Sequence, residues 1–182
     1  FCLSRGLGDV YKRQALREVR KRTDRYLIVN EGPWGTTCAR VGCMPSKALI
    51  EAANAFHRLH TFEAFGLRGA SALTADLPSV LQRVRALRDD FVAGALKATN
   101  ELGSNQVSGR ATLLGPRSVD IDGTAYATRS IIIATGSRPR LPEAWLAFGD
   151  RMLTTDTLFE QPTLGPRIAA VSYTHLTLPT KA

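Results

Sequence analysis

The sequence contains no run of about 18 or more apolar residues, so we expect neither a membrane-spanning helix nor a membrane partner. It has only three cysteines among 182 residues, and two of them lie close together, which is not the framework of a disulfide-stapled secreted domain. Aromatic residues make up 7% and do not interleave with clustered lysine and arginine, so the net charge of +8 does not predict a nucleic-acid partner. These absences leave a globular, cytoplasmic domain as the expectation.

Both ends of the chain are expected to be foreign to the fold. Residues 8–14 can be encoded by a DNA segment whose complementary strand, shifted by one frame, encodes residues 171–175. One DNA element read in opposite directions resembles a transposon-end sequencing adapter, so we expect residues 1–14 and 171–182 to be adapter-like and residues 15–170 to form the domain. A native tail at each end is the alternative. The first fourteen residues carry a net charge of +2 and the last twelve carry +1, so the domain itself is mildly basic at +5 and retains two cysteines.

Hydrophobic periodicity predicts helices and strands in alternation. We expect the end of a helix at 15–22, a buried strand at 26–29, helices at 45–59 and 77–96, and strands near 106–113, 118–121 and 124–134. The dipeptide Asp122-Gly123 is a hairpin signal, which favours an antiparallel meander. The last predicted strand ends in a nearly all-apolar run, so it is expected to return into a buried sheet. Beyond Gly136 the chain is rich in proline and is expected to be irregular.

The most informative feature is a pair of cysteines, Cys38 and Cys43, separated by four residues. A disulfide between them is feasible if the backbone turns at Gly42, which lies between them. A helix starting near Pro45 would place Cys43 at a positive helix end, where a thiolate is favoured, and Lys47 would add a positive charge one turn later. This arrangement favours a redox-active disulfide. Two ordinary buried cysteines are the alternative.

Two alternatives from other classes of protein remain open at this point. The residues Cys38, Cys43, His57 and His60 have a spacing near that of a zinc finger, which suggests a zinc-binding module. However, the two residues between the histidines are one fewer than usual, and the apolar face of the helix already explains its periodicity. A basic nucleic-acid-binding domain is the second alternative.

A second chemical signal is the run 131–139, a buried strand that ends in the small residues Ala134-Thr135-Gly136. Together with the run 35–47, it resembles the class I flavin-dependent pyridine nucleotide-disulfide oxidoreductases over nearly all of residues 15–170. The resemblance implies an α/β fold: a partial FAD-binding Rossmann-like domain of three layers with an inserted antiparallel β-meander. It is strongest to the members that oxidise dihydrolipoamide, and mercuric and glutathione reductases are the alternatives within the family.

The resemblance also implies roles for individual residues. Cys38 would be the thiol that exchanges with the dithiol substrate, and Cys43 would be the thiol that contacts the flavin. The implied cofactor-binding residues are Glu31, Gly35, Thr36, Thr37, Lys47, Gly109, Ala111, Thr135, Gly136 and Ser137. Glu31 would bind the ribose, with Asn30 as the alternative at that position, and no metal site is implied.

Three parts of the family's pattern are missing from the sequence. The first strand and its Gly-x-Gly-x-x-Gly turn are expected just before residue 15, and Gly6 and Gly8 are not taken as their remnants. The NAD-binding domain and the dimerisation domain, which supplies a His-Glu base pair, are also absent. We therefore expect a fragment that binds FAD poorly and is inactive alone. In the intact homodimer, the resemblance implies that dihydrolipoamide reduces the disulfide, Cys43 passes electrons to FAD, and NAD receives them.

Overall fold

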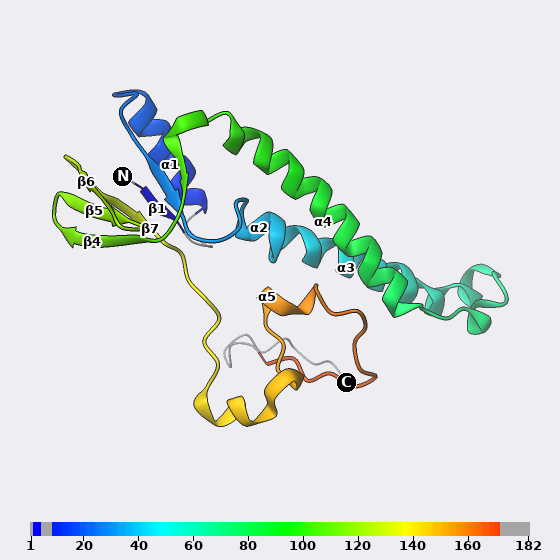
Figure 1. Ribbon diagram of the computed structural model, residues 1–182. Coiled ribbons are helices and arrows are strands. Elements are labelled where there is room, and N and C mark those ends of the chain that lie inside the picture. Colours follow the sequence, from blue (N-terminus) through cyan, green and yellow to red (C-terminus); the bar gives the residue numbers. More distant parts are fainter. Residues whose placement is uncertain (1, 5–8, 172–182) are drawn as a thin grey trace.

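The computed structural model describes residues 2–4 and 9–171, and within them a parallel sheet lies beside a pair of long helices (Figure 1). The strands of this sheet are β1 (Cys2–Ser4), β2 (Ile28–Asn30), β3 (Gln106–Ser108) and β7 (Ile132–Ala134). Their order is β3-β2-β1-β7, and all neighbours run parallel. Because parallel neighbours need crossover connections, this order is that of an α/β fold, as predicted.

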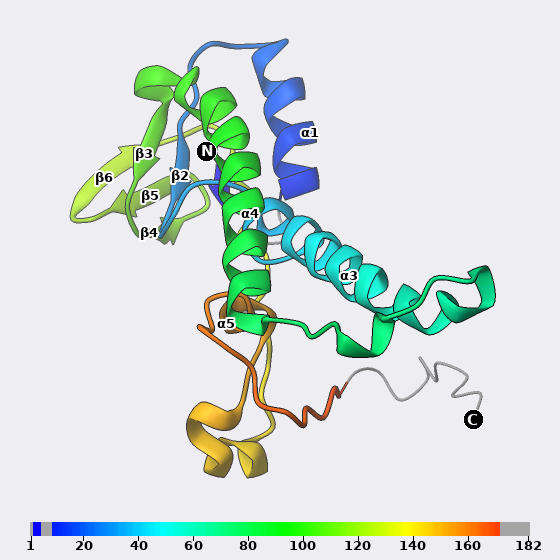
Figure 2. The same cartoon turned by 90° about the vertical axis from the view of Figure 1, so that its right-hand side faces the viewer.

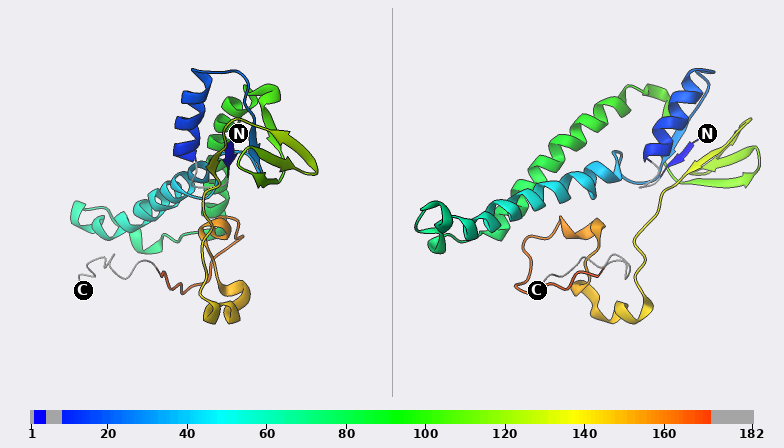
Figure 3. Two further views of the ribbon diagram at one scale, coloured as in Figure 1. Left: turned by 90° about the vertical axis from the view of Figure 1, so that its left-hand side faces the viewer. Right: turned by 180° about the vertical axis from the view of Figure 1, so that it is seen from behind.

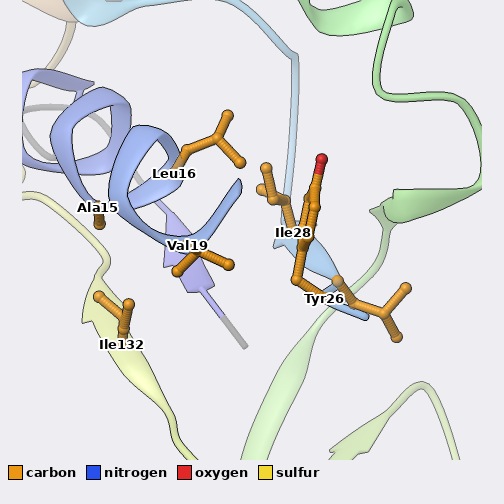
Figure 4. A pocket seen from close by; sticks show the side chains of 7 residues that line it. Ala15, Leu16, Val19, Tyr26, Ile28 and Ile132 are labelled. Carbon is orange, nitrogen blue, oxygen red and sulfur yellow. The ribbon is translucent and has the colours of Figure 1, made fainter. Parts of the chain in front are cut away.

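Helix α1 (Asp9–Arg20) covers one face of the parallel sheet. Its apolar side chains Leu16 and Val19 point toward Ile28 of β2 and Ile132 of β7, as Figure 4 shows. The cavity left between helix and sheet measures only 20 Å³, which is room for about one water molecule. This face is therefore core, and the predicted helical end at 15–22 belongs to it.

A three-stranded meander covers the opposite face of the sheet. Its strands are β4 (Ala111–Gly115), β5 (Ser118–Ile121) and β6 (Thr124–Ala127), paired antiparallel in that order. Successive side chains of a strand point to opposite faces of the sheet, so the Val29 side chain lies on the other face from that of Ile28. There it packs against Val119 and Ile121 of the meander. Helix, parallel sheet and meander are thus the predicted three layers.

The hairpin between β5 and β6 forms at the expected dipeptide. Asp122 has a φ of 47° and Gly123 a φ of 89°, which is the positive-φ pair that a two-residue hairpin turn requires. The Gly123 amide also donates to the Asp120 carboxylate at 3.1 Å. After the meander the chain returns into the buried sheet as β7, so this prediction is confirmed.

The structure corrects one expectation about the fold. We predicted that its first strand was missing, yet Cys2–Ser4 forms β1 between β2 and β7. A parallel ladder is made of backbone groups, which three residues of almost any type can supply, so sequence pattern says little about such a short strand. Gly6 and Gly8 lie outside the described residues, as does all but the first residue of the predicted adapter-like segment 171–182. Helix α1 runs across the expected boundary at residue 15 without interruption.

Two long helices and one short helix form a layer of their own beside the sheets (Figure 2). They are α2 (Thr37–Arg40), α3 (Cys43–His57) and α4 (Leu77–Asn100). Short 3-10 turns at Arg58–Thr61, Glu63–Phe65 and Ala70–Ala72 connect α3 to α4, and another at Gly103–Asn105 precedes β3. Helix α4 packs against both α2 and α3. Within the described part of the chain, none of the helices is both long and apolar enough to cross a bilayer.

After β7 the chain leaves the sheets as an extended segment, seen from two further sides in Figure 3. It then forms a 3-10 segment at Glu143–Arg151 and the one-turn helix α5 (Thr155–Leu158), in keeping with the irregular region predicted. Arg85 of α4 donates to the carbonyl oxygens of Phe159 at 3.2 Å and Gln161 at 2.8 Å. These bonds and the buried Phe159 ring fasten the segment to α4.

Candidate redox site

The two cysteines lie on either side of a sharp turn between α2 and α3. Cys38 is the second residue of α2 and Cys43 is the first residue of α3, so α3 begins two residues earlier than predicted. Thr36 caps α2: its hydroxyl accepts from the Ala39 amide at 3.0 Å, which satisfies a backbone donor that the helix leaves unpaired. The cap fixes the direction in which the chain enters the thiol-bearing turn.

Gly42 makes the turn compact. A Cβ at this position would lie 3.0 Å from the Thr37 carbonyl oxygen and 3.3 Å from the Cys38 Cα, both of which are backbone atoms. Glycine at this position therefore lets the start of α3 come this close to α2, and the backbone does turn at Gly42. The close approach brings the side chains of Cys38 and Cys43 into hydrogen-bonding contact.

Both cysteines are exposed free thiols in this structure. The hydrogen bond with the Cys43 side chain, followed by partial burial, raises the pKa of the Cys38 thiol above its ordinary value. The backbone of Cys43 and the charge of Lys47 oppose this rise but are the smaller effects. The interaction between the two thiols therefore favours the protonated form of Cys38.

The loop before α2 contains several of the predicted cofactor-binding residues. Strand β2 ends at Asn30, which is 7% exposed, whereas Glu31 is the first exposed residue after it. The Asn30 amide donates to the carbonyl of Gly32 at 3.0 Å, so its side-chain oxygen is left as an acceptor. Asn30 thus ends the strand and Glu31 is the next residue, so both positions predicted for a ribose-binding residue lie at the edge where a Rossmann fold has it.

Two further predicted segments lie at the same edge of the sheet. Thr135, Gly136 and Ser137 directly follow β7, are exposed, and include a φ of 70° at Gly136. Gly109 directly follows β3 and its amide donates to the Asn30 carbonyl at 3.1 Å. Because parallel strands end at the same edge of the sheet, these residues lie there together with the loop after β2. Ala111 is the first residue of the meander strand β4.

Lys47 lies one turn into α3 and borders an open groove between α3 and α4. The groove has a volume of 540 Å³ and is lined by Met44, Lys47, Ala48, Glu51, Ala52, Ala55, Leu87 and Phe91. One end of the groove lies beside Cys43, because the lining residue Met44 directly follows Cys43 in the chain. The structure thus places a cation and an apolar concave surface next to the thiol pair.

The geometry does not support the zinc alternative. Cys43 and His57 are the two end residues of α3, so they lie about 21 Å apart at a rise of 1.5 Å per residue. His57 and His60 contact each other, with ring centroids 5.2 Å apart, at the end of α3 remote from the thiols. Among the described residues there is no group of three or more histidine, cysteine, aspartate or glutamate side chains positioned to hold a metal ion. The zinc alternative is therefore wrong.

The residues at the sheet edge fit a dinucleotide with a flavin at one end. The hydroxyl groups of Thr135 and Ser137 and the backbone around Gly136 are exposed at this edge, where nucleotides bind in open α/β sheets. The start of α3 has no side-chain cap, and its positive end favours a negative group. A pyrophosphate-bearing ligand would thus find small residues and hydrogen-bond donors on the side of the sheet that leads to the thiols.

Sequence reasoning missed two residues at this edge of the sheet, Trp34 in the loop after β2 and Ser108 at the end of β3. Trp34 donates from its indole nitrogen to the Ser108 hydroxyl at 2.7 Å. No local signal pointed to either residue, because they lie 74 positions apart and their contact depends on the pairing of β2 with β3.

Comparisons with known proteins agree with this geometry. The family model of the pyridine nucleotide-disulphide oxidoreductases matches residues 13–171. A dihydrolipoyl dehydrogenase of Thermus scotoductus is 37% identical over 134 residues, covering 69% of this chain and 27% of the relative. A glutathione reductase of Burkholderia cepacia is 30% identical over 172 residues, covering 94% of this chain and 37% of the relative.

A solved structure supports the fold. The crystal structure of LpdA from Mycobacterium tuberculosis superposes with a TM-score of 0.65 at 20% identity, over 90% of this chain and 37% of that one. The chain thus spans between about a quarter and two fifths of the length of these relatives.

Proposed function

The chain belongs to the pyridine nucleotide-disulphide oxidoreductase family, whose members use FAD with NAD(P), and we propose that it is the flavin-side part of a dihydrolipoamide dehydrogenase. The observation that carries the proposal is the thiol pair of Cys38 and Cys43, brought into contact at the start of α3 by Gly42. In the intact enzyme, a cytoplasmic homodimer, electrons pass from dihydrolipoamide through this pair to FAD and then to NAD.

The thiol chemistry is an exchange between the dithiol of the substrate and the Cys38–Cys43 disulfide. A thiolate of dihydrolipoamide attacks the Cys38 sulfur of the Cys38–Cys43 disulfide, which forms a mixed disulfide and releases Cys43 as a thiolate. The second substrate thiol then displaces Cys38, so one disulfide bond breaks, one forms, and the two protein thiols carry the electron pair. When bound, FAD supplies the acceptor for that pair and delivers it onward as hydride.

The surroundings of the pair support the division of roles. Interaction with Cys43 raises the pKa of the Cys38 thiol. Cys43 is the first residue of α3, where the helix end is positive, and Lys47 lies one turn along the same helix, so a thiolate released at Cys43 would lie beside positive charge. Asn30, Gly35, Thr36, Thr37, Thr135, Gly136 and Ser137 are the residues that would hold the cofactor from the sheet edge.

A glutathione-reductase-like activity is the second candidate. The relative from Burkholderia cepacia covers 94% of this chain, and the same thiol pair would then reduce glutathione disulfide. The two candidates share every residue of the site described above, so they differ in substrate rather than in mechanism.

A trapping experiment tests the proposed roles of the thiols. In a Cys2→Ser background, Cys43→Ser and Cys38→Ser variants are incubated with oxidised lipoamide and with glutathione disulfide, and mixed disulfides are located by mass spectrometry. We expect Cys38 of the Cys43→Ser variant to form the adduct faster than Cys43 of the Cys38→Ser variant, and lipoamide to react faster than glutathione disulfide. Preferential labelling of Cys43 contradicts the assignment, and faster reaction with glutathione disulfide favours the second candidate.

The cofactor is tested on the longer enzyme, recovered with its flanking sequence. Reduction of that enzyme should give the long-wavelength absorption band of a thiolate next to flavin. The Cys43→Ser variant should lack this band, whereas the Cys38→Ser variant should show it without reduction. An unchanged band in Cys43→Ser would falsify the role given to this residue.

A further inference from the structure

A hydrogen bond ties the loop 31–36, which connects β2 to α2, to a strand far away in the sequence. The indole nitrogen of Trp34 donates to Ser108 Oγ at 2.7 Å, and Ser108 is the last residue of β3. The Trp34 side chain is half-buried, so the loop is held against the carboxyl edge of the sheet near its middle rather than only at its ends.

The base of the same loop is bound to the same strand end. The Asn30 carbonyl accepts from the Gly109 amide at 3.1 Å, and the Asn30 side chain donates to the Gly32 carbonyl at 3.0 Å. Gly109 follows Ser108 directly, so Asn30 is bound to the residue after β3 and Trp34 to the last residue of β3. The loop segment between Asn30 and Trp34 is therefore held at both of its ends by neighbouring residues of the chain.

The chain between Trp34 and the thiols is short and constrained. Gly35 has a φ of +114°, and a Cβ there would lie 3.1 Å from the Arg40 side chain of α2 and 3.7 Å from Val92 of α4, so this residue lies between the two helices. Thr36 then caps α2 through the Ala39 amide. Cys38 follows Trp34 by only four residues, so a displacement of Trp34 is transmitted to the thiol with few bonds to absorb it.

We infer that Trp34 and Ser108 form a clamp that positions Cys38 against Cys43, with Trp34 acting as a positioning residue. This inference rests on the redox role proposed for the thiol pair. In the dithiol form the clamp restricts the movement of α2 relative to α3, which raises the effective concentration of one thiol at the other. The disulfide therefore forms more readily with the clamp than without it.

The test measures that effective concentration by equilibrium with glutathione. One glutathione disulfide oxidises the pair: a protein thiolate forms a mixed disulfide and releases one glutathione thiol, and the second protein thiol displaces the other, leaving the Cys38–Cys43 disulfide. The 182-residue chain in a Cys2→Ser background is equilibrated in glutathione buffers, quenched with acid, alkylated and weighed by mass spectrometry. The measurement needs neither FAD nor dihydrolipoamide.

Trp34→Phe and Ser108→Ala should each lower the effective concentration about 3- to 10-fold, which corresponds to the net contribution of one hydrogen bond. Because both changes remove the same bond, the double variant should lose no more than either single variant. Ser108→Thr keeps the hydroxyl and should restore the value of the unsubstituted chain. Trp145→Phe removes the other tryptophan, which lies in the segment after β7, and should have no effect.

Three results would overturn the clamp. They are an unchanged effective concentration in Ser108→Ala, additive losses in the double variant, or an equal loss in Trp145→Phe. If Trp34→Phe fails to fold, Ser108→Ala and Ser108→Thr decide the matter between them. If dihydrolipoamide does not reduce the pair but the glutathione equilibrium responds as expected, the proposed substrate fails and the clamp stands.

Discussion

Gly42→Ala is the sharpest perturbation of the thiol pair that leaves both sulfur atoms in place. The new Cβ would meet the Thr37 carbonyl oxygen at 3.0 Å and the Cys38 Cα at 3.3 Å. Neither atom belongs to a flexible side chain, so α2 and the start of α3 must move apart to accept the methyl group. The substitution thus acts on the separation of the two cysteines.

The expected cost follows from this crowding. Forcing an extra methyl group into a packed site costs about 1–3 kcal/mol. A glycine-to-alanine change recovers about 0.4–1 kcal/mol through the unfolded chain only where alanine accepts the native backbone angles. At Gly42 the added Cβ meets backbone atoms, so that recovery is lost. We expect unfolding to become easier by about 1–3 kcal/mol, which lowers the Tm by about 2–10 °C.

Thermal denaturation of the reduced chain measures the stability, and equilibrium with glutathione measures the pairing. If about 1.4 kcal/mol of the strain falls on the disulfide form, the equilibrium shifts tenfold toward the dithiol. Gly94→Ala is the matched control, because a Cβ at this position in the interior of α4 meets nothing within 4 Å and should stabilise the chain by about 0.5–1 kcal/mol. The reasoning is refuted if Gly42→Ala is as stable as Gly94→Ala and pairs its thiols equally well.

Three further predictions concern the surroundings of the pair. Iodoacetamide should label Cys38 only as the pH rises above the ordinary range of a thiol. Cys43→Ala should lower the midpoint pH of Cys38 labelling, because it removes the largest cause of the raised pKa. An unchanged midpoint pH contradicts this prediction. The raised pKa also means that the stability contributed by Cys38 is present below the ordinary pKa and is lost as the pH rises through the raised one. Arg85→Ala removes two hydrogen bonds to the backbone, so hydrogen exchange at residues 155–161 should accelerate, and unaltered protection counts against the attachment to α4. Asn30→Asp replaces a buried donor by a carboxylate facing a carbonyl oxygen, and should lower the free energy of unfolding in urea by about 1–3 kcal/mol, unlike Asn54→Asp on the exposed surface of α3.

The parts of the fold that the sequence predicts are those decided by neighbours in the chain. The apolar spacing of α3 and α4 and the Asp122-Gly123 turn each depend on a few consecutive residues. The turn was found where expected, and both helices formed with one or both ends shifted by two to four residues. The end of β2 was predicted one residue early, since a strand boundary is determined by its pairing partners rather than by its own pattern. That small difference places Asn30, and not Glu31, at the strand end.

Contacts between distant segments were beyond the reach of the sequence. Strand β1 was not expected, because parallel pairing uses backbone groups and places few demands on three residues. The zinc alternative was based on spacing along the chain. Because Cys43 and His57 lie at opposite ends of helix α3, they are too far apart to bind one ion. Trp34 and Ser108 meet only because β2 and β3 are neighbours in the sheet.

The thiols themselves are exposed, so their geometry has to come from the backbone around them. It is held by the Thr36 cap, the close contact at Gly42 and the bond from Trp34, none of which involves a sulfur atom. The hydrophobic cluster around Val29 lies elsewhere, between the parallel sheet and the meander. Substitutions at Thr36, Gly42 or Trp34 should therefore impair thiol pairing with little loss of core stability. A substitution that leaves a cavity at Val29 should instead lower the stability of the whole fold and impair thiol pairing with it.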